Sequence, residues 1–329
     1  MRRIIILMYM FFLAFIPMTV SGQEGISHWF QPLTGKQGTA VSGRFEYSPR
    51  ERVKDQVTGL EESRWEASIL IPLVQGPDRE WTAVSRLGLR DIHTRAVLPN
   101  TGDEMPAELW DLHFGAVYRR RLSGNWIIGG NLSLSSPSDR PFNGWYETAV
   151  MLNGYLNIPA AGRDSWVFFL NYSTNREFLP HVPIPGAGYL HAPSRDFSAL
   201  VGIPLLFVNY SPAKGLQLRG FYFPIHSVFA GCEYQLSPLI GIFASFRWEN
   251  DRYYRAGRED RDDRLFWYEQ RAEGGISLHP AGDIEVTLSG GYAFDRFFFE
   301  GESYNDDRTD NRVDVGDGPV LSVRAVSRF

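Results

Sequence analysis

The feature that most constrains this chain is a repeated alternation of apolar and polar residues, which begins near Thr39 and continues to the last residue. In the first segment Val41 and Phe45 alternate with Arg44 and Glu46. Successive side chains of a strand point to opposite faces, so a period of two predicts strands with one apolar and one polar face. Segments of about ten residues with this pattern are typical of transmembrane β-barrels. We count 14 segments, with 12 as the alternative.

The connections between the segments alternate between short turns, such as 122–125 and 236–238, and longer loops. This alternation predicts an all-β, single-chain antiparallel transmembrane β-barrel, with both termini in the periplasm if the strand count is even. One connection, Pro224 to Ser227, is short where a long loop is due, and this is why 12 strands stays open. The longer connections are expected at 49–63, 95–106, 136–143, 175–195, 250–264 and 299–318.

Tryptophans gather near both ends of the predicted strands. An indole ring favours a membrane interface, where one edge meets water and its face meets hydrocarbon, so two groups indicate two aromatic girdles. A soluble β-sandwich would instead bury most of them in a single core. The two groups are Trp81, Trp126 and Trp166 beside short turns, and Trp65, Trp110, Trp145, Trp248 and Trp267 beside long loops.

The first 22 residues have the three parts of a secretory signal peptide: Arg2 and Arg3, an apolar run over 4–15, and small residues up to Gly22. The apolar run is shorter than the roughly 20 residues that a membrane-spanning helix needs. We therefore expect a signal peptide at 1–22, a short periplasmic segment at 23–38 and the barrel at 39–329. No apolar run after residue 22 is long enough for a transmembrane helix.

Composition argues against several classes of function. The formal net charge of −5 does not suit a nucleic-acid-binding protein. The seven histidines lack the spacing of metal ligands, and the G-x-S-x-G motif of serine hydrolases is absent from the sequence. We therefore expect no metal, no cofactor and no enzymatic activity. A barrel-embedded lipid hydrolase is kept as a less favoured alternative.

The chain ends on a strand pattern from Pro319 to Phe329, in which Leu321 and Val323 alternate with Ser322 and Arg324. This pattern, closed by a terminal Phe, resembles the last strand of Gram-negative outer-membrane β-barrels, which seals the barrel and serves as the assembly signal. The resemblance implies an outer-membrane location among lipids and lipopolysaccharide, and recognition of Phe329 by the assembly machinery.

Taken as a whole, the mature chain resembles an uncharacterised family of single-domain outer-membrane barrels. A barrel of fourteen strands is also similar to the transporters of hydrophobic compounds and fatty acids. Residues 23–38 are, however, too short to form the amino-terminal hatch of those proteins. The resemblance therefore favours passive diffusion over specific uptake.

The polar faces of the predicted strands are rich in charge. An arginine on the lipid face would cost about 2–4 kcal/mol at the bilayer midplane, so these faces are expected to point inward. We predict a passive channel for small solutes through this charged lumen, and keep as an alternative a structural or adhesive barrel whose interior charges pair and plug it. The lumen candidates are Arg44, Glu46, Glu66, Arg86, Arg90, Asp111, Arg119, Arg219, Glu233, Arg247, Glu249, Glu269, Arg271, Glu273, Glu285 and Arg324.

Two stretches depart from the alternation. Residues 197–210, counted as one strand, are apolar on both faces, and the preceding stretch 178–192 is apolar and rich in proline. We expect the latter to be a loop that folds into the barrel mouth as a constriction; a loop over the rim or a partner surface is the alternative. The runs 252–264 and 300–317 are expected to be solvated loops. Constriction candidates are Pro180, His181, Pro183, Pro185 and Tyr189.

Overall fold

The computed structural model describes residue 33 and residues 38–329, apart from 177–178, 225–226 and 310. Contacts divide the chain into Met1–Pro32 and Leu33–Phe329, and only the second unit is described below. The predicted signal peptide and nearly all of segment 23–38 lie outside the described residues and stay predictions. Among the residues described, no helix is long and apolar enough to cross a membrane.

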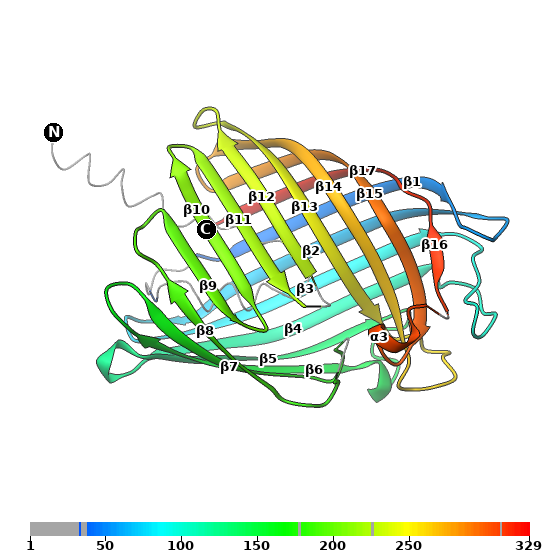
Figure 1. The fold of residues 1–329 in the computed structure, drawn as a ribbon, viewed down its shortest axis with the longest axis horizontal. Helices are drawn as coiled ribbons and strands as arrows, with labels where there is room; N and C mark the ends of the chain where they lie inside the picture. Colours follow the sequence, from blue (N-terminus) through cyan, green and yellow to red (C-terminus); the bar gives the residue numbers. More distant parts are fainter. Residues whose placement is uncertain (1–32, 34–37, 177–178, 225–226, 310) are drawn as a thin grey trace. The chain divides into compact units, whose positions relative to one another are not determined.

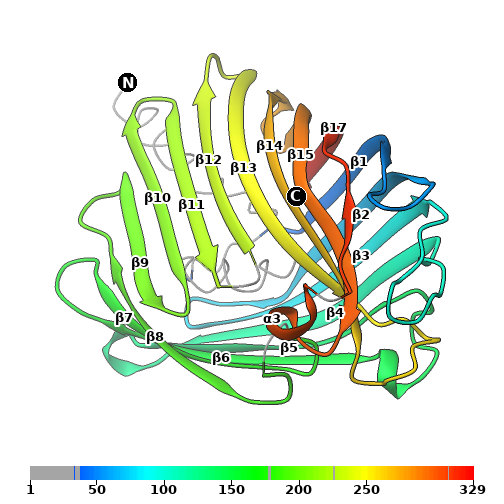
Figure 2. The same cartoon turned by 45° about the vertical axis from the view of Figure 1, so that its right-hand side comes forward.

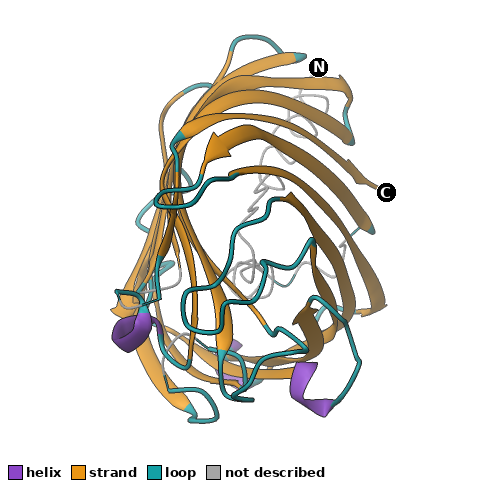
Figure 3. Ribbon diagram, turned by 90° about the vertical axis from the view of Figure 1, so that its right-hand side faces the viewer, coloured by secondary structure: helices purple, strands orange, loops and turns teal. Residues whose placement is uncertain are grey.

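The second unit is a closed antiparallel β-barrel (Figures 1 and 3). Of seventeen strands, β16 pairs only with β15, and the other sixteen form the ring, which β17 closes by pairing with both β15 and β1. The only α-helix of the described barrel is the short α3 (Tyr304–Asp307). The strands are β1 (Ala40–Arg52), β2 (Gly59–Gln75), β3 (Arg79–His93), β4 (Glu108–Arg121), β5 (Ile127–Ser138), β6 (Ala149–Pro159), β7 (Ser165–Ser173), β8 (Ile184–His191), β9 (Phe197–Ile203), β10 (Leu206–Ala213), β11 (Leu216–Phe223), β12 (Ser227–Gln235), β13 (Ile240–Tyr253), β14 (Arg264–Ala281), β15 (Ile284–Gly301), β16 (Val313–Val315) and β17 (Gly318–Arg328).

The prediction of 14 strands is therefore wrong by two. Residues 197–210 form two strands, β9 and β10, whose chain reverses at 204–205. The reversal explains why this stretch is apolar on both sequence parities. The second missing strand is β8, which lies within the stretch predicted to be a loop and pairs with β7 and β9.

The barrel has two unlike ends. The turn end carries the start of β1 and the end of β17, where the Phe329 amide donates to the Thr39 carbonyl oxygen at 2.8 Å. The opposite, loop end carries the long connections, which extend to the right in Figure 1. Short connections at 204–205 and 224–226 interrupt this series. The predicted alternation is thus confirmed except beside β9 to β12.

The outer and inner faces follow the predicted parity. Exposed apolar side chains cover the outside, among them Leu132 at 54%, while the charged neighbours on the other parity are buried inside. Trp267 is the exception to the predicted girdle: it is 2% exposed and lies in an interior apolar cluster, because it shares its parity with Glu269 and Arg271 on β14. Trp65, Trp81, Trp126, Trp145 and Trp166 are exposed.

The wall is uneven in height (Figure 2). Strands β14 and β15 each have 18 residues, whereas β9 has 7 and β10 and β11 have 8. On β13 the last partner of β12 is Glu249, opposite Ser227, so β13 continues to Tyr253 beyond the end of its neighbour. The loop end is therefore lower along β8 to β12 than along β13 to β15.

Candidate functional site in the barrel interior

All sixteen lumen candidates lie on the inner face, and each takes part in an ion pair. Nine of them belong to one connected network on β1 to β3, β13 and β14. The other seven form separate pairs elsewhere in the barrel. Whether these residues act in transport is not decided by their placement, and that role stays a prediction.

Arg271 on β14 is the centre of the network. Its guanidinium contacts Glu46 at 2.5 Å, Glu269 at 2.5 Å and Glu273 at 3.1 Å, and its side chain is only 7% exposed. Arg44 pairs with Glu46 and Glu273 from the other side. Buried charges of this kind are tolerated only when opposite charges and hydrogen bonds satisfy them.

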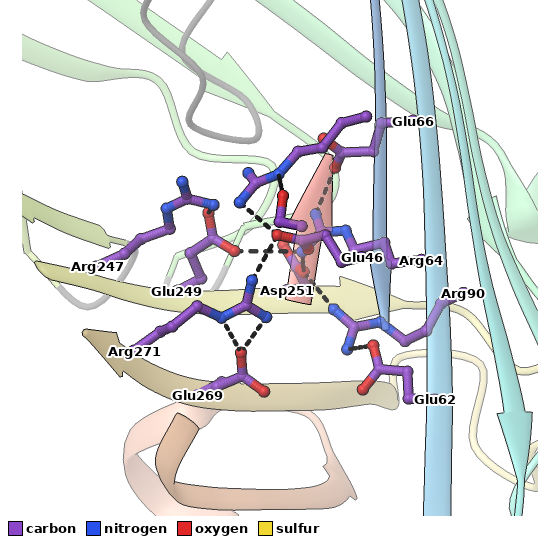
Figure 4. Close-up of polar contacts among 12 residues, drawn as sticks. Glu46, Glu62, Arg64, Glu66, Arg90, Arg247, Glu249, Asp251, Glu269 and Arg271 are labelled. Atoms are coloured by element: carbon purple, nitrogen blue, oxygen red, sulfur yellow. Dashed lines mark hydrogen bonds and ion pairs between the residues drawn. The ribbon is translucent and has the colours of Figure 1, made fainter. Parts of the chain in front are cut away.

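The network crosses the lumen (Figure 4). Arg64 on β2 contacts Glu249 on β13 at 3.2 Å, and Arg90 on β3 contacts Asp251 on β13 at 2.9 Å. Along the wall, β14, β15, β17 and β1 lie between β13 and β2, so these contacts join strands that are not neighbours and cross the interior. The ion pairs therefore form a partition on this side of the lumen.

Four network members were not among the candidates, namely Glu62, Arg64, Asp251 and Arg296. Glu62 pairs with Arg90 at 2.5 Å, Asp251 with Arg90 at 2.9 Å, and Arg296 with Glu269 at 3.0 Å. Glu62 and Asp251 lie in ranges predicted to be loops, although the polar parity continues through them into the longer strands β2 and β13. Arg296 follows an irregularity in the β14–β15 register, which changes the parity near Asp295.

Two of the separate pairs are more accessible to water than the centre of the network. The side chains of Arg86 and Asp111 are 16% and 23% exposed, and those of Arg219 and Glu233, 2.6 Å apart, are 11% and 22% exposed. Arg324 and Glu285 approach to 3.8 Å. The Glu285 side chain is 7% exposed, and the pair of Arg119 with Glu80 is fully buried. Water thus reaches the interior beside β3, β4, β11 and β12.

Uncharged polar side chains line a further part of the interior. Asn131, Asn153 and Asn171 stand in register on β5, β6 and β7, and the Asn171 amide donates to Asn153. Arg176 donates to the Asn171 side-chain oxygen at 2.6 Å and to the Val182 carbonyl oxygen at 3.0 Å, which ties connection 174–183 to this row. These asparagines were not among the lumen candidates, because the candidates were chosen by charge and these side chains carry none.

An apolar cluster lies on the loop-end side of the network. Trp267 stacks with Phe298 at 5.8 Å between ring centroids, and the Arg90 guanidinium lies 4.4 Å from the Trp267 ring centroid. The cluster therefore adjoins the ion pairs directly. Its members are Val53, Leu60, Ile92, Ala96, Leu98, Met105, Leu109, Tyr253, Leu265, Trp267, Phe298, Val313 and Val315.

The connection 254–263, between β13 and β14, reaches across the loop end. The Tyr254 amide donates to the Pro137 carbonyl oxygen at 2.7 Å, and Ser138 and Tyr254 form a parallel bridge. The Ala256 amide donates to the Asp139 carboxylate at 2.7 Å. The end of β13 is therefore bound to the end of β5 on the opposite wall.

Arginines of this connection fix it to the other loops. Arg255 makes two 2.9 Å hydrogen bonds to the carboxylate of Glu300 and one of 2.7 Å to Asp103. The hydrogen bond from Arg255 lowers the pKa of Asp103. Arg258 pairs with Glu147 at 3.3 Å. The prediction that 252–264 is only a solvated loop is wrong, because Arg255 and Arg258 bind side chains of other segments.

The predicted constriction is only partly a loop. Pro180, His181 and Pro183 lie in connection 174–183, and their role in a constriction stays a prediction. Pro185 and Tyr189 lie in β8 opposite the outward-facing Leu170 and Trp166, so they do not line the lumen. This part of the prediction is wrong because these residues belong to the barrel wall.

Tyr189 supports a turn instead. Its hydroxyl donates to the Asp164 carboxylate at 2.8 Å, which also lies 2.9 Å from His191 Nδ1 and accepts a 2.8 Å bond from the Ala192 amide. These contacts, the Ala192 amide first, lower the pKa of Asp164 to about 2. Asp164 thereby holds the 160–164 turn against the end of β8.

One histidine and one serine among the described residues lie side by side in the barrel wall. His113 and Ser135 are register partners on β4 and β5, yet no hydrogen bond joins them, and the neighbouring Asp111 pairs with Arg86. His226 of the adjacent His-Ser pair lies outside the described residues. Within the described part of the chain, His, Cys, Asp and Glu form no group that could hold a metal ion.

No protein-family model matches this chain, and no curated protein matches its sequence. Solved outer-membrane structures do resemble its fold. An outer membrane channel from Pseudomonas putida F1 is 11% identical, with a TM-score of 0.38 over 95% of this chain and 100% of that one. Pseudomonas aeruginosa OccK7 is 11% identical, with a TM-score of 0.41 over 89% and 99%. The Pseudomonas putida toluene transporter TodX is 9% identical, with a TM-score of 0.39 over 94% of each chain.

These TM-scores are below 0.5, so the class follows from the geometry of the chain itself. A closed sheet leaves no strand edge unpaired, which is the condition for strands to cross a bilayer. The outside is apolar and the inside carries the charges, the arrangement of a transmembrane barrel and the reverse of a soluble one. The chain is a transmembrane β-barrel of sixteen wall strands.

Proposed function

We propose that the protein is an outer-membrane channel for small solutes, with the turn end in the periplasm. Transmembrane barrels with short turns and long loops place the turns in the periplasm. In this proposal the conducting path follows the inner face of β3 to β12, beginning at Arg86 on β3, and the ion-pair network with its apolar cluster forms the closed side.

The observation that carries the proposal is the difference in exposure between two of the separate pairs, Arg86 with Asp111 and Arg219 with Glu233, and the carboxylates at the centre of the network. Asp111 and Glu233 keep 23% and 22% of their side chains exposed, whereas Glu46 and Glu273 keep 4% and 5%. Exposed charges that line a pore select permeating ions by their field, while buried pairs contribute structure. Arg86, Asp111, Arg219 and Glu233 are thus the proposed selectivity residues.

A structural barrel with a closed interior is the second candidate. It is favoured by the connection 254–263, which binds the walls at β5 and β13 together at the loop end. Under this alternative the interior charges serve stability alone. An adhesive function would then reside in the exposed loops.

Single-channel recording separates the two candidates. The refolded mature protein is placed in a planar bilayer, and the reversal potential is measured in a salt gradient. The proposal expects conductance, and a shift toward cation selectivity in Arg86→Glu and Arg219→Glu. Arg195→Glu, an exposed arginine in the turn between β8 and β9, is the matched control and should shift it less. Barrels that are correctly folded but silent would reject the channel.

A further inference from the structure

Two arginines face each other on the outside of the barrel at the turn end. Arg79 on β3 and Arg120 on β4 are direct register partners, and both are exposed. Their parity is that of Trp81 and Tyr118, which point outward. Like charges directly opposite each other in an antiparallel pair destabilise the sheet. An anion between them would reverse the sign of this interaction.

No carboxylate of the described residues pairs with either arginine. Neither guanidinium forms an ion pair or hydrogen bond with a described residue, in contrast to the arginines on either side of Arg120. Arg119 points inward and pairs with Glu80, and Arg121 donates to the Leu33 carbonyl oxygen at 3.2 Å. Of three consecutive arginines, only the outward one lacks a partner among the described residues.

The surroundings match the headgroup level of a membrane. Trp81 and Tyr118 are register partners two residues along the strands from Arg79 and Arg120, and their ring centroids are 4.6 Å apart. Tryptophan and tyrosine are enriched at membrane–water interfaces. Leu73 and Val74 expose 62% and 41% of their surface nearby on β2. Apolar chains could therefore lie against β2 while a charged group meets the arginines.

A pocket of about 500 Å³ joins these features. It is lined by Arg79, Arg120, Tyr118, the apolar Val74 and the turn residues 75–78. Asp78 is the one carboxylate in this lining, so the two guanidiniums leave a net positive charge. Arginine is the residue best suited to phosphate, because its planar fork donates two parallel hydrogen bonds to the oxygens.

We infer that this pocket binds the phosphate of a membrane glycerophospholipid, with Arg79 and Arg120 as a phosphate clamp and the Trp81–Tyr118 pair beside the glycerol region. The inference rests on the proposed membrane location, and it names a specific lipid contact at the turn-end interface. It is independent of conduction, because the pocket lies outside the lumen. Removing both guanidiniums should weaken binding at least about tenfold, since each makes charged hydrogen bonds.

The test is native mass spectrometry of the full mature protein in a phosphate-free detergent, titrated with dioleoylphosphatidylglycerol. The wild type should bind one lipid strongly, and the double variant Arg79→Gln/Arg120→Gln should lose this binding. Arg163→Gln, an exposed turn-end arginine without a described partner, should bind as the wild type does. Dioleoylglycerol, which has the same chains without phosphate, should not replace the lipid.

Three outcomes would overturn the inference: equal lipid binding by the double variant, equal binding of dioleoylglycerol, or saturation of the site by inorganic phosphate alone. Heat-modified migration on gels verifies that each variant is folded. A wild-type protein that fails to enter vesicles would reject the membrane location itself. A wild-type protein that inserts and conducts but binds no phosphatidylglycerol in this titration would reject only the clamp.

Discussion

The substitution Arg271→Gln tests whether the cross-lumen network stabilises the barrel. Arg271 is 7% exposed and contacts Glu46, Glu269 and Glu273 within 3.1 Å, so its loss leaves three buried carboxylates with fewer counter-ions. Breaking a buried pair by removing one partner typically costs about 3–5 kcal/mol. Other arginines still reach these carboxylates, which places the expected loss at about 3 kcal/mol, roughly a 100-fold change in the unfolding equilibrium.

The assay is urea unfolding of the protein refolded into lipid vesicles, followed by tryptophan fluorescence. Arg219→Gln is the matched control, since it removes one pair whose carboxylate is 22% exposed and should cost about 1 kcal/mol or less. The second change Glu269→Gln in the Arg271→Gln background removes an excess negative charge and should restore part of the loss. Equal unfolding midpoints for Arg271→Gln and Arg219→Gln would refute the reasoning.

Three further predictions concern the loop end, the turn end and the outer face. Arg255→Gln breaks the pairs with Asp103 and Glu300, and should raise single-channel conductance; an unchanged conductance would show that connection 254–263 does not limit the current. The pKa of Asp164, lowered to about 2, means that its stabilisation is complete above about pH 4 and is lost as the pH falls toward 2. The unfolding midpoint of Asp164→Asn should therefore vary less than that of the wild type across this window, and parallel curves would contradict the assignment. Leu132→Arg, on the exposed apolar face, should cost about 2–4 kcal/mol in urea unfolding, and a neutral effect would argue against lipid at that height.

The sequence predicted the barrel class because membrane strands carry a simple rule: one face meets hydrocarbon and the other does not. The predicted number of strands was wrong where the two faces of a strand do not differ clearly in polarity. Along 197–210 the chain reverses within an apolar stretch, so two strands resemble one, and β8 is rich in proline and glycine and hides its alternation. Pairing partners, which no local pattern reveals, decide both cases.

The site was predictable only in part for a similar reason. Parity alone placed Arg44, Glu46 and Arg271 on the inner face, but parity does not say which inner residues meet across the lumen. The contact of Arg64 with Glu249 depends on the curvature that brings β2 near β13, 185 residues apart in the chain. The connection 254–263 looked solvated in the sequence because its arginines bind partners from three distant segments, at Asp103, Glu147 and Glu300.

The uneven height of the wall requires the surrounding bilayer to deform on one side of the barrel. The seven residues of β9 extend about 24 Å, and at a tilt of about 45° they span only about 17 Å of membrane thickness. The apolar band of a typical outer-membrane barrel is about 25 Å tall, so lipids beside β9 have to shorten or tilt, while those beside the 18-residue β14 do not. Hydrophobic mismatch is thus concentrated on one flank, and thinner bilayers should stabilise the protein most.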